Sequence, residues 1–295
     1  MSEGTGAVRL VDAHHHLWDL DRNRYPWLNG PDAEPGAPSY RVEDYLADLG
    51  DAPVLRSVHV EAAFEPADPV GETRWLQEVA ERHGFPHAIV AHAALERPDA
   101  GEVLAEHVRS PNVRGIREML DRDLATQVSR RTKLLQDPRW LAGLRRLPPL
   151  GLSFDLQVLP SQLEEAAAVA RAVPDLLFLL NHGGYHVRAS PEEEAQWRRG
   201  IRALAAQDNV VVKASGYDAV DPTWPPDGFD SYVYELLEVF GVERALFGTN
   251  FPVEKRSTTF PALLAAYKRA TAGLSPSERD AFYYGNAMRC YRLEG

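Results

Sequence analysis

Cysteine is almost missing from the sequence, since Cys290 is the only one among 295 residues. A single thiol excludes a disulfide within the chain and any metal site built from several cysteines, and it is typical of a reducing compartment. Long apolar runs are missing too: stretches such as Leu176–Leu180 are far shorter than the roughly 20 residues of a membrane-spanning helix. Residues 1–6 lack the basic and apolar segments of a signal peptide. We therefore expect a cytoplasmic protein that makes no contact with a membrane.

Positive charge is scarce as well. The chain has 32 Lys and Arg residues against 43 Asp and Glu residues, which gives a net charge of −11. Proteins that bind nucleic acids or membrane surfaces usually present a basic face, so this balance disfavours both classes. A hydrophobic content of 44% is ordinary for a globular protein with a sizeable core. The expected partner is a small-molecule substrate. The sequence leaves open whether the protein forms a homo-oligomer.

Short apolar or β-branched runs recur along the whole chain and predict eight strands. Most are apolar throughout, which is typical of strands covered on both faces of a parallel sheet. The runs are residues 8–13, 54–60, 88–94, 113–116, 151–158, 176–181, 210–214 and 245–248.

Helical patterns lie between most of these strands. They cover residues 72–83, 161–172, 192–207 and 231–240, and the second begins with Ser161 and Glu164 in the spacing of a capping box. Eight strands that alternate with helices predict an α/β fold of the (β/α)8 TIM-barrel type, in one domain over residues 1–295. A doubly wound sheet is the alternative. In the barrel, helices over residues 275–293 would close the outside.

Two segments rich in Pro, Gly and Asp interrupt this pattern, at residues 20–50 and 218–230. Both contain aromatic residues, such as Trp27 and Trp224. Loops that carry large apolar side chains usually fold back onto the protein, so we interpret both segments as lids or pocket walls.

Polar residues end nearly every predicted strand. In a parallel barrel the carboxyl ends of the strands form one rim, which is where the chemistry takes place. The residues at these ends are Asp12, His14, His15, His16, His59, Glu61, Arg117, Glu118, Asp155, Gln157, Asn181, His182, Lys213, Ser215, Thr249 and Asn250. We expect their side chains to converge at one site.

The spacing of His14 and His16 is informative. Residues two apart on a strand share a face, so these two imidazoles point the same way and His15 points the other way. Adjacent imidazoles can bind a divalent metal such as Zn²⁺, or can donate together to a carbonyl oxygen. His182 follows another apolar strand and would join them, although a single histidine in that position can also be a buried structural residue.

The segment Asp12–Trp18 resembles the first-strand signature of the amidohydrolase superfamily, in particular its type 2 branch. That branch includes fuconolactonase-like enzymes, pyrone-dicarboxylate lactonases and, more distantly, aminocarboxymuconate decarboxylases. Residues 25–28, 59–62, 114–117, 154–158, 181–184, 212–216, 247–253 and 285–288 match the branch in order, so the resemblance covers nearly the whole chain. It implies a barrel hydrolase in which His14, His16 and His182 bind a divalent metal, Zn²⁺ or Mn²⁺, or hold the substrate carbonyl without one.

The sequence departs from that family at one position. The family's last-strand aspartate, a general base and sometimes a metal ligand, aligns with Asn250. An amide does not take a proton from water at neutral pH and is a weak metal ligand. The surrounding residues resemble a subgroup that carries Asn here. Glu61, Asp155 or a histidine could replace the base, or a bound metal could lower the pKa of water toward 7. Metal-dependent and metal-free mechanisms both stay open.

Two cationic residues at strand ends complete the predicted site. Arg117 and Lys213 suit a substrate carboxylate, phosphate or enolate, whereas an internal ion pair of Arg117 with Glu61 or Asp155 is the structural alternative. The predicted catalytic residues are His14, His16, His182, Asn250 and Asp155. The predicted substrate-binding residues are Trp18, Glu61, Arg117, Gln157, Tyr185, Lys213 and Lys255.

Taken together, the residues and the resemblance predict an enzyme that hydrolyses a small cyclic substrate, in the first place a lactone. A decarboxylase or another lyase, acting on a cyclic or unsaturated carboxylate in the same barrel, is the first alternative, because it has less need of a hydrolytic base. A barrel that binds a small molecule without turnover is the second.

Overall fold

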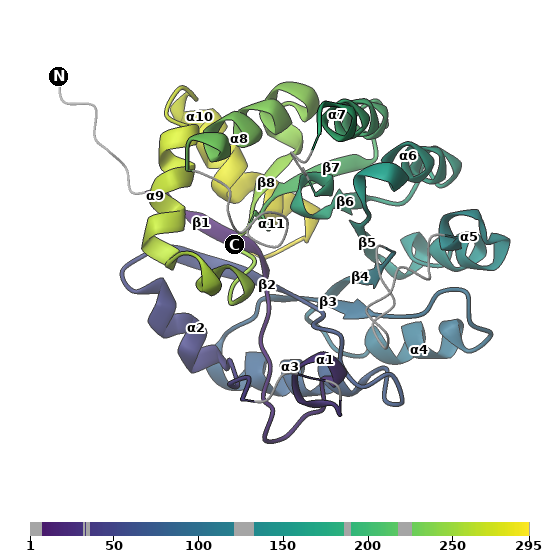
Figure 1. Ribbon diagram of the computed structural model, residues 1–295. Coiled ribbons are helices and arrows are strands. Elements are labelled where there is room, and N and C mark those ends of the chain that lie inside the picture. The colour runs from purple at the N-terminus through teal and green to yellow at the C-terminus, as the bar shows by residue number, and fades with distance from the viewer. Residues whose placement is uncertain are drawn as a thin grey trace.

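The computed structural model describes residues 8–31, 33, 36–120, 133–185, 190–217 and 226–294. Eight strands form one sheet, and each strand pairs in parallel with the next one along the chain. The strands are β1 Leu10–His15, β2 Val54–Val60, β3 Ala88–His92, β4 Val113–Met119, β5 Ser153–Gln157, β6 Phe178–Leu180, β7 Val210–Ala214 and β8 Ala245–Phe247. Figure 1 shows them as a ring with helices around the outside.

The ring closes where the residues after β8 meet the end of β1. Asn250 donates its backbone N–H to the carbonyl of His14, and His16 donates its own to the carbonyl of Phe251, each at 2.7 Å. The structure therefore confirms the predicted (β/α)8 barrel and excludes the doubly wound sheet. No helix in the described ranges is long and apolar enough to cross a membrane.

The helices follow the predicted alternation. They are α1 Pro26–Asn29, α2 Val42–Leu49, α3 Gly71–His83, α4 Ala100–His107, α5 Pro138–Leu144, α6 Leu163–Ala172, α7 Pro191–Ala205, α8 Pro226–Phe240, α9 Phe260–Ala270, α10 Pro276–Asp280 and α11 Asn286–Cys290. The predicted capping box at Ser161 is wrong in its details. A short 3-10 turn precedes α6, and the side chain of Gln162 accepts from the backbone N–H of Leu159 at 2.8 Å.

The last helix does not cover the outside of the barrel, as the sequence suggested. Figure 1 shows α11 over the centre of the strand ring. Its residues Ala287 and Cys290, with Tyr291 and Leu293 after it, join a buried cluster formed by inward-facing strand residues such as Val11. The C-terminal segment thus fills one end of the barrel interior. Burial of these apolar side chains explains its position.

A bulge in β1 sets the position of the histidines. Asp12 lies opposite Ser57 and His15 lies opposite His59, so three steps on β1 match two steps on β2. An extra residue of this kind reverses the alternation of side chains. Val11, before the bulge, and Ala13, within it, face the barrel interior, whereas His14 and His16 lie at or behind the cavity wall.

Candidate active site

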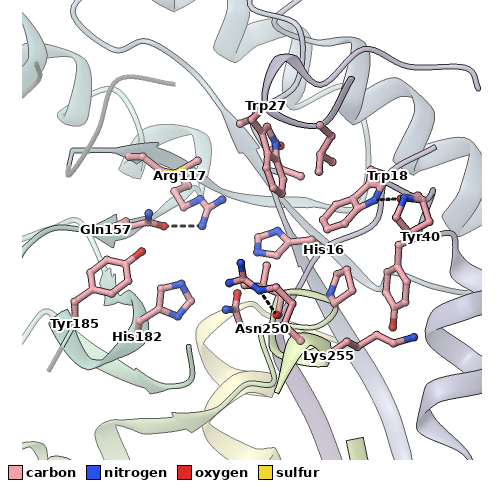
Figure 2. Close-up of a pocket in the computed structure, with 18 residues that line it drawn as sticks. His16, Trp18, Trp27, Tyr40, Arg117, Gln157, His182, Tyr185, Asn250 and Lys255 are labelled. Carbon is pink, nitrogen blue, oxygen red and sulfur yellow. Dashed lines mark hydrogen bonds between the residues drawn. The ribbon is translucent and has the colours of Figure 1, made fainter. Parts of the chain in front are cut away.

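A cavity of about 650 Å³ opens at the carboxyl ends of the strands. Eight of the predicted site residues line it: His16, Trp18, Arg117, Gln157, His182, Tyr185, Asn250 and Lys255. Residues 20–50 form one wall through Trp27, Leu28, Pro38 and Tyr40, as predicted. In the second predicted lid, residues 218–225, with Trp224, lie outside the described residues. Figure 2 shows the aromatic wall facing His16, His182 and Asn250.

The three predicted imidazoles meet beside this cavity. The ring centroids of His14 and His16 are 5.0 Å apart, and those of His14 and His182 are 4.6 Å apart. His14 is fully buried behind the other two. His15 lies on the opposite face, where its ring stacks on Tyr45 at 4.2 Å. The alternation rule therefore gave the correct face for each of the three consecutive histidines.

Hydrogen bonds fix how the rings present their nitrogens. His16 Nδ1 lies 2.7 Å from the carbonyl oxygen of Val60, which can only accept, so Nδ1 carries the proton and Nε2 carries a lone pair. His182 Nδ1 lies 3.0 Å from the Ser215 hydroxyl. His14 Nδ1 lies 3.5 Å from Lys213 Nζ, and His14 Nε2 is buried without a hydrogen-bond partner among the described residues.

His14 and His16 are neutral at pH 7. Burial lowers the pKa of His14 well below its usual value, and the nearby charge of Lys213 lowers it further. Burial also lowers the pKa of His16 well below its usual value, with Arg117 adding to the effect. A neutral imidazole can accept a proton, and one whose tautomer is fixed accepts it at a known atom.

Arg117 forms an internal ion pair with Glu61, which is one of the two internal pairs that the sequence left open for it. Its Nε donates to Glu61 Oε1 at 2.7 Å and its Nη1 donates to Gln157 Oε1 at 2.8 Å, while Nη2 donates to the carbonyl of Glu61. Burial raises the pKa of Glu61, but Arg117 and other neighbours outweigh it, so the pKa lies below the usual value. Glu61 does not line the cavity and acts by holding Arg117 at its wall.

Asp155 and Lys213 lie deeper in the barrel than the sequence suggested. They form a fully buried ion pair with each other, and the Tyr291 hydroxyl donates to Asp155 at 3.1 Å. Neither residue lines the cavity. Asp155 shares a face with Gln157 but precedes it by two residues, which places it about 6–7 Å further from the rim. Lys255 does line the cavity, and it pairs with Asp48 at 2.7 Å.

Backbone strain is concentrated at this site. Four of the five non-glycine residues with positive φ in the described ranges line the cavity: Ala63, His182, Tyr185 and Asn250. The left-handed region costs such residues roughly 1–3 kcal/mol each, and it persists where the surrounding structure enforces it. This concentration is typical of functional sites.

Two acidic residues that were not among the predicted catalytic or substrate-binding residues support the site. Asp12 accepts from the backbone N–H groups of His14 and Thr249 and from the hydroxyls of Thr249 and Tyr45, at 2.7–3.2 Å. It therefore joins the end of β1 to the segment after β8. Burial raises its pKa to about 6. Glu254 accepts from Asn250 Nδ2 at 3.2 Å. The position of Asp12 at a strand end was the one sequence feature that indicated its place at the site. No spacing in the sequence indicated that Glu254 would lie there.

The arrangement does not fit a preassembled metal centre. Zinc ligation by histidine requires nitrogens about 2.0–2.1 Å from one point. In the part of the chain that the structure describes, no three His, Cys, Asp or Glu side chains are gathered in this way. A ligating His14 Nε2 would also need the ring proton on Nδ1, which would face the Lys213 ammonium, another donor. The metal-ligand role of His14, His16 and His182 stays a prediction.

Comparison with known proteins gives consistent results. Residues 11–293 match a family model described as "Amidohydrolase". An uncharacterized protein from Sinorhizobium fredii is 39% identical, over 97% of this chain and 99% of that protein. An L-fucono-1,5-lactonase from Burkholderia ambifaria is 30% identical, over 96% of each. An amidohydrolase from Burkholderia multivorans, solved with bound zinc, has a TM-score of 0.83 at 26% identity, over 97% of this chain and 100% of that chain.

Proposed function

The chain belongs to the amidohydrolase family, and from this premise we propose that it hydrolyses the lactone of a sugar acid. The family and the lactonase relatives make the protein a hydrolase, and the activity of those L-fucono-1,5-lactonases supports a sugar lactone as its substrate. The observation that carries the proposal is the meeting of His14, His16 and His182 beside a cavity large enough for a sugar ring.

The aromatic wall suits a cyclic substrate. Trp18 Nε1 donates to the carbonyl of Pro38 at 2.9 Å, and Trp27 Nε1 donates to the carbonyl of Ala62 at 2.7 Å. Because these bonds use the polar edge of each indole, the apolar ring surfaces are left for packing against a ligand. The two rings meet edge to face at 5.5 Å, which gives the wall a fixed shape.

Arg117 and His182 are the groups we assign to the substrate carbonyl. Three of the five guanidinium N–H groups of Arg117 are used by Glu61 and Gln157, which leaves two for a ligand. The carbonyl oxygen gains negative charge as water attacks, and a fixed cation beside it stabilises that charge. His14 lies behind His182 and supports its position by ring contact.

His16 is the group we assign to the attacking water. Its Nε2 has the lone pair on the side away from Val60, and Asn250 lies nearby as a second polar group at the cavity wall. Water forms a bond to the carbonyl carbon and gives a proton to Nε2. The ring C–O bond then breaks, and the same proton passes to the leaving oxygen, which yields a hydroxy acid. The acid residues Glu61 and Asp155 take no part in this scheme, because each is held in an ion pair.

A divalent ion would supply a Lewis acid to such a reaction, and the similar protein from Burkholderia multivorans was solved with bound zinc. The residues here do not fit one as arranged, so the scheme uses the chain's own groups alone. A decarboxylase is a second candidate on one observation: the described cavity lining contains Arg117, Lys255 and Arg256 but no carboxylate. Such a lining suits a substrate that carries a carboxylate.

The test is an assay of the purified protein on sugar-acid lactones, including L-fucono-1,5-lactone, with a pH indicator to detect acid release. We expect release faster than spontaneous ring opening for at least one lactone. In parallel, cyclic unsaturated carboxylates are assayed for CO₂. Release of CO₂ without any lactone hydrolysis would overturn the proposal in favour of the lyase.

A further inference from the structure

The side chain of Asn250 is held from behind by a second buried residue. Asn250 Nδ2 donates to Glu254 Oε1 at 3.2 Å, and both residues are 2% exposed. Asn250 lines the cavity, whereas Glu254 does not. The pair lies in the segment that follows β8, where Glu254 belongs to a 3-10 turn over Val253–Arg256.

The backbone holds both partners in place. Asn250 has φ of +59°, and its N–H donates to the carbonyl of His14 at 2.7 Å. The carbonyl of Glu254 accepts from Ser257 and Thr258 at 3.1 and 3.0 Å. Neither side chain can move away by a simple backbone rotation without breaking these bonds, so the contact between them is a fixed feature of the site.

The chemistry of the pair determines which way the amide points. The structure places Asn250 Nδ2, and not Oδ1, against Glu254 Oε1, which is the orientation in which the carboxamide donates and the carboxylate oxygen accepts. The reverse orientation would place Oδ1 against the carboxylate, leaving two buried acceptors in contact without a proton between them. With Nδ2 directed away from the cavity, Oδ1 is directed toward it.

We propose that Glu254 is a positioning residue that keeps Asn250 Oδ1 facing the cavity, where it accepts a hydrogen bond from the attacking water. Position 250 thereby keeps the acceptor that an aspartate would offer, although the amide cannot take the proton. The catalytic part of this inference rests on the proposed hydrolase function. The orientation of the amide does not.

The pair also explains why position 250 carries an amide and not a carboxylate. An aspartate at position 250 would place a second carboxylate at the same short distance from Glu254. Two buried carboxylates this close cannot both ionise at little cost. Asn250 and Glu254 are therefore matched, and changing both together should be tolerated better than changing the first alone.

The experiment is a cycle of variants at the two positions: Asn250→Asp, Glu254→Gln and the double variant Asn250→Asp/Glu254→Gln. Glu243→Gln makes the same chemical change at an exposed glutamate and serves as the control. Thermal unfolding at pH 7 is measured first, without substrate. We expect Asn250→Asp to lower the melting temperature by about 3–6 °C and the double variant to return to within about 1 °C of the parent, because the amide that Glu254→Gln introduces can donate to the new carboxylate. Melting temperatures that shift additively overturn the pairing.

The catalytic arm uses a lactone that the parent protein hydrolyses. In Glu254→Gln either end of the glutamine amide can face Asn250, so the orientation is no longer unique. We expect kcat to fall about tenfold with KM within about twofold, and kcat of the double variant to exceed that of Asn250→Asp by at least about tenfold. An unchanged kcat in Glu254→Gln overturns the positioning role. If the parent protein hydrolyses no lactone, the proposed function is wrong. The melting temperatures still test whether Asn250 and Glu254 interact.

Discussion

The imidazole rings of His14 and His182 lie 4.6 Å apart, although His14 belongs to the first strand and His182 follows the sixth. Two glycines make room for them. A Cβ on Gly248 would come within 3.0 Å of His14 Cβ, and one on Gly216 would come within 2.1 Å of His182 Nδ1. The site thus depends on the closure of the whole barrel and on the absence of a side chain at Gly216 and Gly248.

His182→Ala should abolish activity and leave the fold intact. The variant removes one of the two groups assigned to the substrate carbonyl, and loss of such a donor typically costs at least about 100-fold in kcat. Lactone hydrolysis and the far-UV circular dichroism spectrum are the measurements. His83→Ala, a change on helix α3 away from the cavity, is the control and should keep full activity. Full activity in His182→Ala would remove His182 from the site.

Gly216→Ala should inactivate the protein by displacing His182. Gly216 has φ of +71°, so the substitution combines backbone strain with the overlap on the His182 ring. Gly241→Ala separates the two effects, because Gly241 has φ of +77° and nothing lies within 4 Å of its added Cβ. Urea unfolding should show a loss of about 1–3 kcal/mol in Gly241→Ala and a larger loss in Gly216→Ala. Only Gly216→Ala should lose lactone hydrolysis, and equal activity in the two variants would contradict the ring displacement.

Removal of metal ions should leave the activity in place. In the ranges that the structure describes, no three His, Cys, Asp or Glu side chains are arranged to hold one metal ion, and Lys213 Nζ faces Nδ1 of His14. The metal content of the purified protein is measured by mass spectrometry before and after dialysis against a chelator, together with kcat/KM. A stoichiometric zinc or manganese ion whose removal abolishes activity, and whose return restores it, would give His14, His16 and His182 the metal-ligand role.

Much of the fold could be predicted because apolar runs mark buried parallel strands. The predicted bounds 54–60 and 210–214 agree with β2 and β7. The shared face of His14 and His16 followed from alternation along a strand, and three histidines placed after apolar strands indeed met at one rim. These inferences need only local periodicity and the rule that parallel strands share a carboxyl edge.

The depth of a residue below the rim could not be predicted in this way. Asp155 and Lys213 were expected at the mouth, yet they pair with each other inside the barrel. Alternation gives the face of a strand residue, whereas its height depends on how neighbouring strands are staggered, which local sequence does not encode. Glu254 was missed for a related reason. A 3-10 turn brings its carboxylate back to Asn250, and no strand or helix period predicts that return.

A buried acid behind the cavity wall gives the protein a pH-dependent stability. Glu72 accepts from the backbone N–H of Ala62 at 3.0 Å, and Ala62 lines the cavity. Burial raises the pKa of Glu72 to about 8, and the charge of Glu61 adds to this effect. His59 Nε2 lies 3.6 Å from Glu72, but burial lowers the pKa of His59 to about 3. The contact between them at pH 7 is therefore one between two neutral groups.

Glu72→Gln should flatten the dependence of stability on pH between 6 and 8. A carboxyl whose pKa rises on folding holds its proton in the folded chain after the unfolded chain has lost it, so the parent protein loses stability as pH rises through this window. The slope from one such group is at most about 1.4 kcal/mol per pH unit. Glutamine mimics the protonated acid and removes this term, and Asp12, with its pKa of about 6, contributes little above that pH. Urea unfolding of the parent protein, Glu72→Gln and the exposed control Glu243→Gln at pH 6, 7 and 8 measures the effect. We expect parallel curves for the parent and the control, and an advantage for Glu72→Gln that grows with pH. A constant difference between Glu72→Gln and the parent would mean that Glu72 is already ionised in the folded protein.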